Sequence, residues 1–368
     1  MAQHPRAQGI CPPSVARALR VPSSDELCYG WRMLKKVLLP VVLSLLFSGP
    51  IFAGHGQALD LGLPIDCKPG EDCWVVNYPD LKDGEGVQDY ACGQASYEGH
   101  KGIDIALRDT ARMRDGVDVL AAAAGTVMVV RDGIRDVDVN EIGFDAVKSV
   151  QCGNQVILLH EGNWATTYCH LRQNSLTVKK GDRVDAGQTL GKVGLSGLTE
   201  FPHAHLHVQR VIDRKGKVVD PFVGEDRQNA CGLGPKPLWK PEVLADLGYQ
   251  PTAIFNIGLS PTAPTVKGIR DGLFLESAAS ADAPLLALWV EIFNLAAEDK
   301  VEFRITDPQG KTVYATAKRL EKRQARWTYF VGKRRKGGPF APGDYSGSVR
   351  VVREGAELVA RKVEIKIK

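Results

Sequence analysis

Three histidines stand at alternate positions in the stretch PHAHLHVQ, residues 202–209. In an extended strand, residues two apart point to the same face, so His203, His205 and His207 would share one face of that strand. Imidazole binds transition metals, and it also exchanges protons near neutral pH. The stretch therefore predicts a strand whose histidine face could hold a metal. The spacing alone leaves open which histidine would bind it.

Two further motifs supply partners for these histidines. GHKGIDIAL places His100 and Asp104 four residues apart, so on an extended segment both side chains lie on one face. Imidazole nitrogen with carboxylate oxygen is a favoured ligand mixture for zinc. TYCHL ends a predicted strand with His170. The three motifs together indicate one metal site rather than scattered surface histidines.

Over residues 97–222 the sequence resembles the lysostaphin-type (LytM-like) zinc endopeptidases, which cut peptide bonds in bacterial cell walls. The resemblance runs through GHKGIDIAL, GVDVLAAAAGTVMVV, CGNQVILLHEGNWATTYCHL, VKKGDRVDAGQTLGKVGLSG, HLHVQ and a closing DPF. It implies an antiparallel β-sheet metallopeptidase domain with one Zn²⁺ per chain. It also implies peptidoglycan as the substrate.

The same resemblance implies roles for individual residues. It makes His100, Asp104 and His207 the zinc ligands, with His207 as the second histidine of the family's H-L-H motif. It makes His170 and His205 the catalytic pair that does not bind the metal, and it leaves His203 outside the pattern. Three protein ligands leave the fourth zinc position open, so a bound water becomes a nucleophile near neutral pH. His205 would accept the proton of that water, and His170 would donate to the oxyanion.

The pattern of strands and turns predicts an all-β chain. Residues 59–230 are predicted to form the peptidase domain, in which QVILLH and WATTYCH flank a three-residue hairpin loop at 161–163. Residues 231–265 are rich in proline and glycine and are predicted to be a linker. Residues 266–368 alternate apolar and polar side chains around turns, which is typical of a small β-sandwich. We expect this last segment to be an accessory domain that folds separately, tethers the enzyme and supplies no catalytic group.

Residues 1–58 are predicted to be a leader that contains a signal peptide. MLKKVLLPVVLSLLFSGPIFAGHGQA, residues 33–58, has a lysine pair, a short apolar run and small residues after it. The apolar run is too short for a confident membrane span. We therefore expect translation to start at Met33, cleavage after Ala53 or Ala58, and a periplasmic or secreted protein without a transmembrane span in the mature chain.

Six cysteines follow the leader, namely Cys67, Cys73, Cys92, Cys152, Cys169 and Cys231. An even count in an exported chain predicts disulfides, and six cysteines allow fifteen pairings that sequence does not resolve. A local bridge between Cys67 and Cys73 could close the turn-like KPGED.

The net charge separates the predicted domains. The leader holds 6 of the 47 Lys/Arg and 2 of the 43 Asp/Glu, so residues 59–368 balance at 41 of each sign, which argues against nucleic acid as a partner. From residue 260 on, 20 Lys/Arg face 13 Asp/Glu. The run GKRRKGG at 332–338 could therefore contact an anionic envelope polymer.

Two alternative functions stay open at this point. The chain could be a catalytically silent, wall-binding regulator of other hydrolases, or a secreted protease that acts on proteins. The presence of all five residues carried over from the family favours an active enzyme.

Overall fold

The computed structural model describes residues 59–226 and 231–368, and the described residues all fall within one compact unit. The predicted signal peptide, with Met33 and both cleavage sites, lies outside the described residues. Among the described residues, no helix has the length and apolar character needed to cross a membrane.

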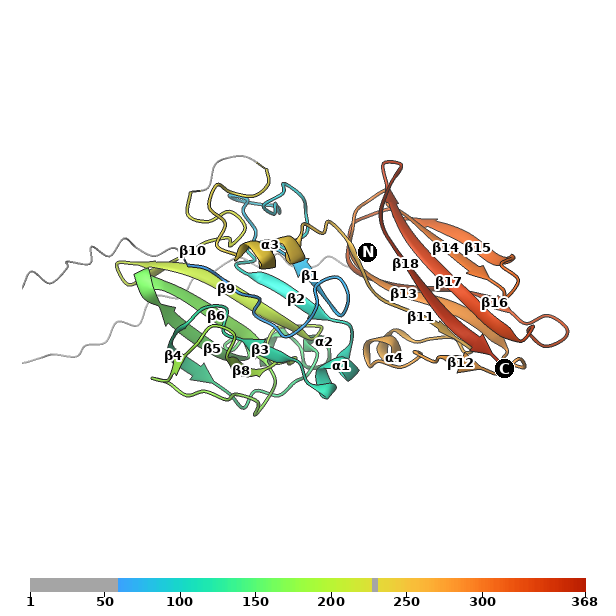
Figure 1. Cartoon of the computed structure of the whole chain (residues 1–368), viewed down its shortest axis with the longest axis horizontal. Helices are drawn as coiled ribbons and strands as arrows, with labels where there is room; N and C mark the ends of the chain where they lie inside the picture. The colour runs from blue at the N-terminus through green and yellow to red at the C-terminus, as the bar shows by residue number, and fades with distance from the viewer. Residues whose placement is uncertain (1–58, 227–230) are drawn as a thin grey trace, which may run out of the picture. The chain divides into compact units, whose positions relative to one another are not determined.

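The first half of the described chain is built on an antiparallel sheet of eight strands (Figure 1). Its strands lie in the order β1-β2-β9-β6-β5-β4-β7, and β10 pairs with β9. Their bounds are β1 Cys73–Asn77, β2 Ile103–Leu107, β4 Gly125–Arg131, β5 Asn154–His160, β6 Trp164–Leu171, β7 Arg183–Val184, β9 His203–Ile212 and β10 Lys215–Val218. A second small sheet pairs β3 Asp118–Leu120 with β8 Thr189–Lys192.

The alternation along β2 and β9 decides which face of this sheet carries polar side chains. Ile103, Ile105 and Leu206 are buried in the main hydrophobic core. Because neighbours along a strand point to opposite faces, Asp104 and His205 project from the other face. The predicted hairpin between β5 and β6 is confirmed, with the short 3-10 helix Glu161–Asn163 in its loop.

The second half of the described chain is the predicted β-sandwich. One sheet has the order β11-β13-β16 and the other β12-β18-β17-β14-β15. Their bounds are β11 Ala253–Ser260, β12 Ala278–Ala279, β13 Leu285–Leu295, β14 Lys300–Thr306, β15 Thr312–Arg319, β16 Gln324–Arg334, β17 Gly343–Arg353 and β18 Ala356–Ile367. Buried side chains from both sheets, among them Leu288 and Val290 of β13 and Phe303 of β14, form a separate core. The all-β fold class predicted from sequence is therefore confirmed.

The segment predicted as a linker, residues 231–265, contains regular structure. Helix α3, Pro241–Leu247, starts on a proline at its first position, where the missing N–H costs nothing. Leu238, Trp239 and Leu247 join the core of the peptidase half. Strand β11 already belongs to the sandwich. Apolar burial thus extends through most of this segment.

Short helices and disulfides complete the peptidase half. The remaining helices are α1 Thr110–Asp115, α2 Val139–Ile142, the 3-10 turn Phe144–Ala146 and α4 Val266–Arg270, the last of which precedes the sandwich strand β12. The six cysteines form three bridges, Cys67–Cys73, Cys92–Cys231 and Cys152–Cys169. The prediction of disulfides is confirmed, and the structure resolves their pairing.

Candidate metal centre

His100, Asp104 and His205 converge on one point above the polar face of the sheet. Asp104 on β2 lies directly opposite His205 on β9. The Asp104 Oδ1 atom is 3.2 Å from His100 Nε2 and 2.7 Å from His205 Nδ1, and these two nitrogens are 3.3 Å apart. A tetrahedral zinc with bonds of about 2.0–2.1 Å holds its ligand atoms about 3.3 Å apart. The three side chains therefore fit a zinc ion with little movement.

Neighbouring groups orient these three side chains. The Nδ1–H of His100 donates to the carbonyl oxygen of Tyr78 at 2.8 Å, which leaves Nε2 with a free lone pair. Asn77, opposite Asp104 on β1, donates from Nδ2 to Asp104 Oδ2 at 2.9 Å. Such contacts fix the tautomer and rotamer of metal ligands in known sites. Gly102 leaves room for His205, because a Cβ there would lie 2.6 Å from its ring.

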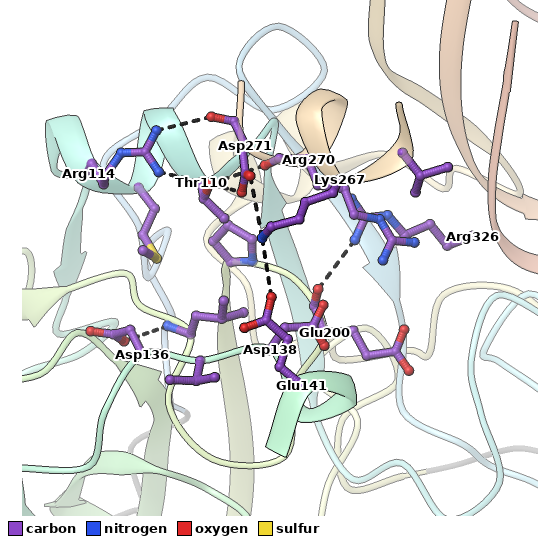
Figure 2. A pocket seen from close by; sticks show the side chains of 15 residues that line it. Thr110, Arg114, Asp136, Asp138, Glu141, Glu200, Lys267, Arg270, Asp271 and Arg326 are labelled. Atoms are coloured by element: carbon purple, nitrogen blue, oxygen red, sulfur yellow. Dashed lines mark hydrogen bonds and ion pairs between the residues drawn. The ribbon is translucent and has the colours of Figure 1, made fainter. Parts of the chain in front are cut away.

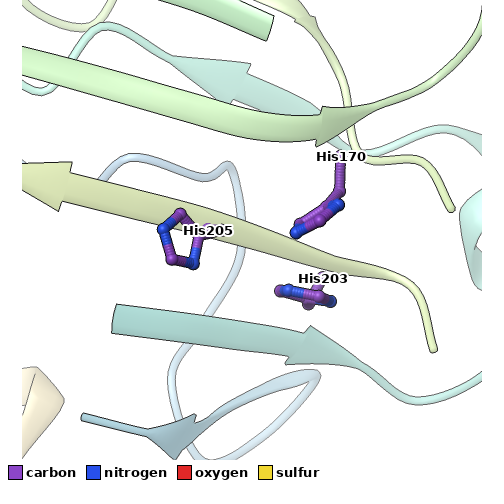
Figure 3. A group of neighbouring side chains, drawn as sticks. All are labelled: His170, His203 and His205. Atoms are coloured by element: carbon purple, nitrogen blue, oxygen red, sulfur yellow. The ribbon is translucent and has the colours of Figure 1, made fainter. Parts of the chain in front are cut away.

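His203 and His170 lie beside this set with their rings 4.7 Å apart (Figure 3). The Nδ1–H of His203 faces the carbonyl oxygen of Phe201 at 2.9 Å, and His203 Nε2 is 3.4 Å from Asp104 Oδ1. The Nδ1–H of His170 donates to the carbonyl oxygen of Ser196 at 2.7 Å. With the proton on Nδ1, the lone pair of each ring lies on Nε2. His170, His203 and His205 also form a second group whose ligand atoms lie within 4.8 Å of one another.

A bulge in β6 aims His170 at the site. His170 has φ of 61°, the register of β6 against β5 shifts at this point, and the His170 N–H donates to the carbonyl of Cys152 at 2.9 Å. A bulge inserts one residue and so breaks the simple alternation of faces. As a result Tyr168, two residues earlier, points into the core, where its hydroxyl accepts from the N–H of Ala122.

Burial and mutual charge perturb the ionisation of this cluster. Burial by itself would raise the pKa of Asp104. The lowering effect of His100 and His203 outweighs it, so the pKa of Asp104 lies well below its usual range. Burial lowers the pKa of His100, but Asp104 raises it above the ordinary value. Burial, reinforced by neighbouring histidines, holds the pKa of His170 well below that value. Burial also lowers the pKa of His205, against the opposing effect of Asp104. The lowered pKa values of Asp104 and His205 favour the carboxylate and the neutral imidazole that bind a metal, whereas His100 must release any proton that Asp104 stabilises on it before its Nε2 can bind.

The structure places His207 differently from the sequence-based assignment. It lies opposite Thr167 of β6, its ring centroid is 6.5 Å from that of His205, and it joins neither histidine group. Burial, with smaller effects of His205, Lys101 and His100, lowers the pKa of His207 to about 3. The residue opposite Asp104 is His205, and that register brings His205 to the ligand set and His203 to His170.

A sequence signal could have given this register. Three histidines at alternate positions contain the motif H-x-H twice. If the family's H-L-H motif is aligned on Leu206, its two histidines are His205 and His207. The resembled family commonly has proline before the motif, and Pro202 directly precedes His203. Anchoring on Pro202 would have selected His203 and His205.

Comparison with known proteins places this site in a family. Two imidazoles and a carboxylate, beside two further histidines on an antiparallel sheet, make up a donor set of the kind that binds zinc in proteins. Residues 98–221 match the model of peptidase family M23. This match covers the segment whose motifs resemble the lysostaphin-type peptidases, so the resemblance inferred from those motifs is confirmed.

Individual relatives match only this part of the chain. It is 30% identical over 117 residues to the cell division protein DipM of Caulobacter vibrioides, covering 31% of this chain and 18% of that protein. It is 31% identical over 90 residues to the peptidoglycan DD-endopeptidase ShyC of Vibrio cholerae, covering 24% of this chain and 18% of that protein. The matched segment thus spans less than a fifth of the length of either relative.

Among solved structures, one similar chain is the catalytic domain of the prophage-encoded M23 protein EnpA from Enterococcus faecalis. It is 22% identical, and the match covers 45% of this chain and 94% of that chain with a TM-score of 0.29.

Proposed function

We propose that this protein is a zinc-dependent endopeptidase that hydrolyses peptide cross-links of bacterial peptidoglycan. The observation that carries the proposal is the convergence of His100, Asp104 and His205 at the spacing of zinc ligands, inside an M23 domain. The name of the relative ShyC supports peptidoglycan as the substrate class. Three disulfides support a periplasmic or secreted location, because such bridges persist in oxidising compartments.

We assign the metal to His100 Nε2, Asp104 Oδ1 and His205 Nδ1, and the acid-base chemistry to His203 and His170. Zinc bound there would polarise a peptide carbonyl and lower the pKa of a water molecule. His203 Nε2, which lies beside the ligand set, takes the proton of the nucleophile and later returns it to the leaving amine. His170 can donate to the carbonyl oxygen, as negative charge develops on it, only after Nε2 takes up a proton, because its Nδ1–H donates to Ser196 and burial keeps the metal-free ring neutral.

Three alanine variants test this assignment, with zinc content and turnover as readouts. His205→Ala should lose the metal, because it removes one of three ligands. His203→Ala should keep zinc and lose turnover by about a hundredfold or more, as expected when an acid-base group is removed. His207→Ala is the matched control from the same strand face, and it should keep zinc.

The outcome separates this assignment from the one based on the family's H-L-H motif. That assignment expects His207→Ala to strip the metal and His203→Ala to have no effect. Mass spectrometry of purified wall fragments before and after digestion identifies the bond that is cut. A zinc-loaded protein that releases no fragment from peptidoglycan would refute the proposed activity and favour a silent regulator.

A further inference from the structure

The β-sandwich packs against the same sheet face that carries the metal centre. Trp74, Val76 and Ala106 of β1 and β2 share a hydrophobic cluster with Ala253, Phe255 and Phe293 of β11 and β13, and Phe201 packs against this cluster. Ala106 lies two residues from Asp104 on β2 and directly opposite His203. The contact with the sandwich therefore begins next to the catalytic histidine.

Arg326 of the sandwich strand β16 lies at the centre of this contact. Its side chain is 9% exposed, and its Nη2 atom is 3.0 Å from Oε1 of the fully buried Glu291. The guanidinium stacks over the rings of Phe201 and Phe293, with centroid distances of 5.6 and 5.8 Å. Figure 2 shows the arginine at the edge of a pocket of about 590 Å³, where Nη1 reaches the carbonyl oxygen of Glu200 at 3.4 Å.

The segment held by Arg326 is also the one that orients His203. The Phe201 ring lies 4.8 Å from the His203 ring, and its carbonyl oxygen accepts from His203 Nδ1. The Thr199 hydroxyl donates to the same carbonyl at 2.8 Å and lies 3.2 Å from His203 Nδ1. The tautomer of His203 thus depends on the position of residues 199–201.

We propose that Arg326 and Glu291 are positioning residues for His203, so that the sandwich is a working part of the peptidase. The guanidinium of the buried ion pair stacks on Phe201 and donates to Glu200. Residues 199–201, held in this way, keep His203 Nε2 directed at the ligand set. This proposal rests on the function proposed above. The sequence alone led us to expect that the sandwich is a separate tether. In the present proposal the sandwich instead helps to orient one catalytic group, His203.

The test uses the full chain with Arg326→Met and Glu291→Gln combined, which removes both charges of the pair; Arg270, 3.7 Å from Glu291, keeps its charge on a side chain that is 28% exposed. Turnover of a short soluble cross-linked peptide should fall at least about tenfold, as for a misplaced catalytic group, with KM changed less than about twofold. Zinc content should not change. ¹⁵N NMR of the zinc-loaded protein should show the Nδ1–H tautomer of His203 in the parent and a mixture in the variant.

Arg361→Met is the matched control. Arg361 stacks over Trp74 at 5.2 Å in the same interface, but its Nη1 donates to the Ile254 carbonyl rather than to residues 199–201. Its loss should leave turnover and the His203 signal unchanged. Arg326→Lys serves if the double variant does not fold, because it keeps the charge opposite Glu291 but loses the flat stacking surface. It should lower turnover at least about threefold and shift the tautomer signal.

A folded, zinc-loaded variant with parental turnover and a parental His203 signal would overturn the proposal. An equal loss in Arg361→Met would also overturn it, because the effect would then belong to the interface as a whole. A parent protein that binds no zinc and cuts no peptide would instead refute the proposed function. The NMR readout needs no turnover, so the two failures are distinguishable.

Discussion

The Cys152–Cys169 bridge ties the strand end that carries His170 to the segment before β5. Cys169 directly precedes His170, and the carbonyl of Cys152 accepts from the His170 N–H at 2.9 Å. His170 has φ of 61°, which is uncommon for a residue other than glycine. Replacing both cysteines by serine should therefore lower the free energy of unfolding and also misplace His170.

The size of the stability loss follows from the loop that the bridge closes. The two cysteines are 17 residues apart in sequence. The chain-entropy relation for a loop of this length gives about 3 kcal/mol at 25 °C. The bridge Cys67–Cys73, with a separation of 6, gives about 2 kcal/mol by the same relation, and it closes the turn that ends at the first residue of β1. It is the control for a loss of stability away from His170.

Urea unfolding and turnover of the two zinc-loaded double-serine variants make the comparison. The Cys152/Cys169 variant should lose about 3 kcal/mol and at least about tenfold in turnover, because small misplacements of catalytic groups are costly. The Cys67/Cys73 variant should lose stability but keep its turnover. Equal turnover in both variants would refute the role of the bridge in placing His170. A stability loss below about 1 kcal/mol would refute the loop-entropy estimate.

Three further predictions concern other parts of the fold. Gly153→Ala should lower turnover with zinc retained. Gly153 has φ of 59°, and a Cβ there would lie 2.2 Å from the Ser196 oxygen that orients His170. Turnover assays at matched zinc content check this, and parental turnover would contradict it. Phe255→Ala should cost about 3–5 kcal/mol, and calorimetry of the parent should show one transition for both halves rather than two. Burial lowers the pKa of His160 in the folded protein. The unfolded chain therefore binds more protons than the folded one at low pH, and stability should fall as the pH drops below about 6.5. In His160→Gln the urea midpoint should depend less on pH.

The strands that carry the site could be predicted from local pattern. Alternation of apolar and polar residues in GHKGIDIAL and PHAHLHVQ predicts extended segments, and the structure has β2 and β9 there. Residue chemistry likewise predicts a site of imidazole and carboxylate, because few other side chains bind zinc. His100 and Asp104 lie at its centre.

Alternation fails where the backbone departs from a regular strand. Tyr168 and His170 are two residues apart, so a regular strand would place both on one face. The bulge at the end of β6 sends Tyr168 into the core and His170 to the site. A bulge depends on how the partner strand and the Cys152 carbonyl meet β6, and both are distant in sequence.

The sequence by itself determined the strands that carry the site, the all-β class, the family resemblance and the residue types of the site, because these depend on local periodicity and on side-chain chemistry. Only the tertiary structure decided which of the three histidines on β9 meets Asp104, since a period of two is the same in every register and the partner strand selects one. It also decided the disulfide pairing, and it placed Arg326 of the sandwich against Phe201. These contacts join residues far apart in the chain, and no local pattern records them.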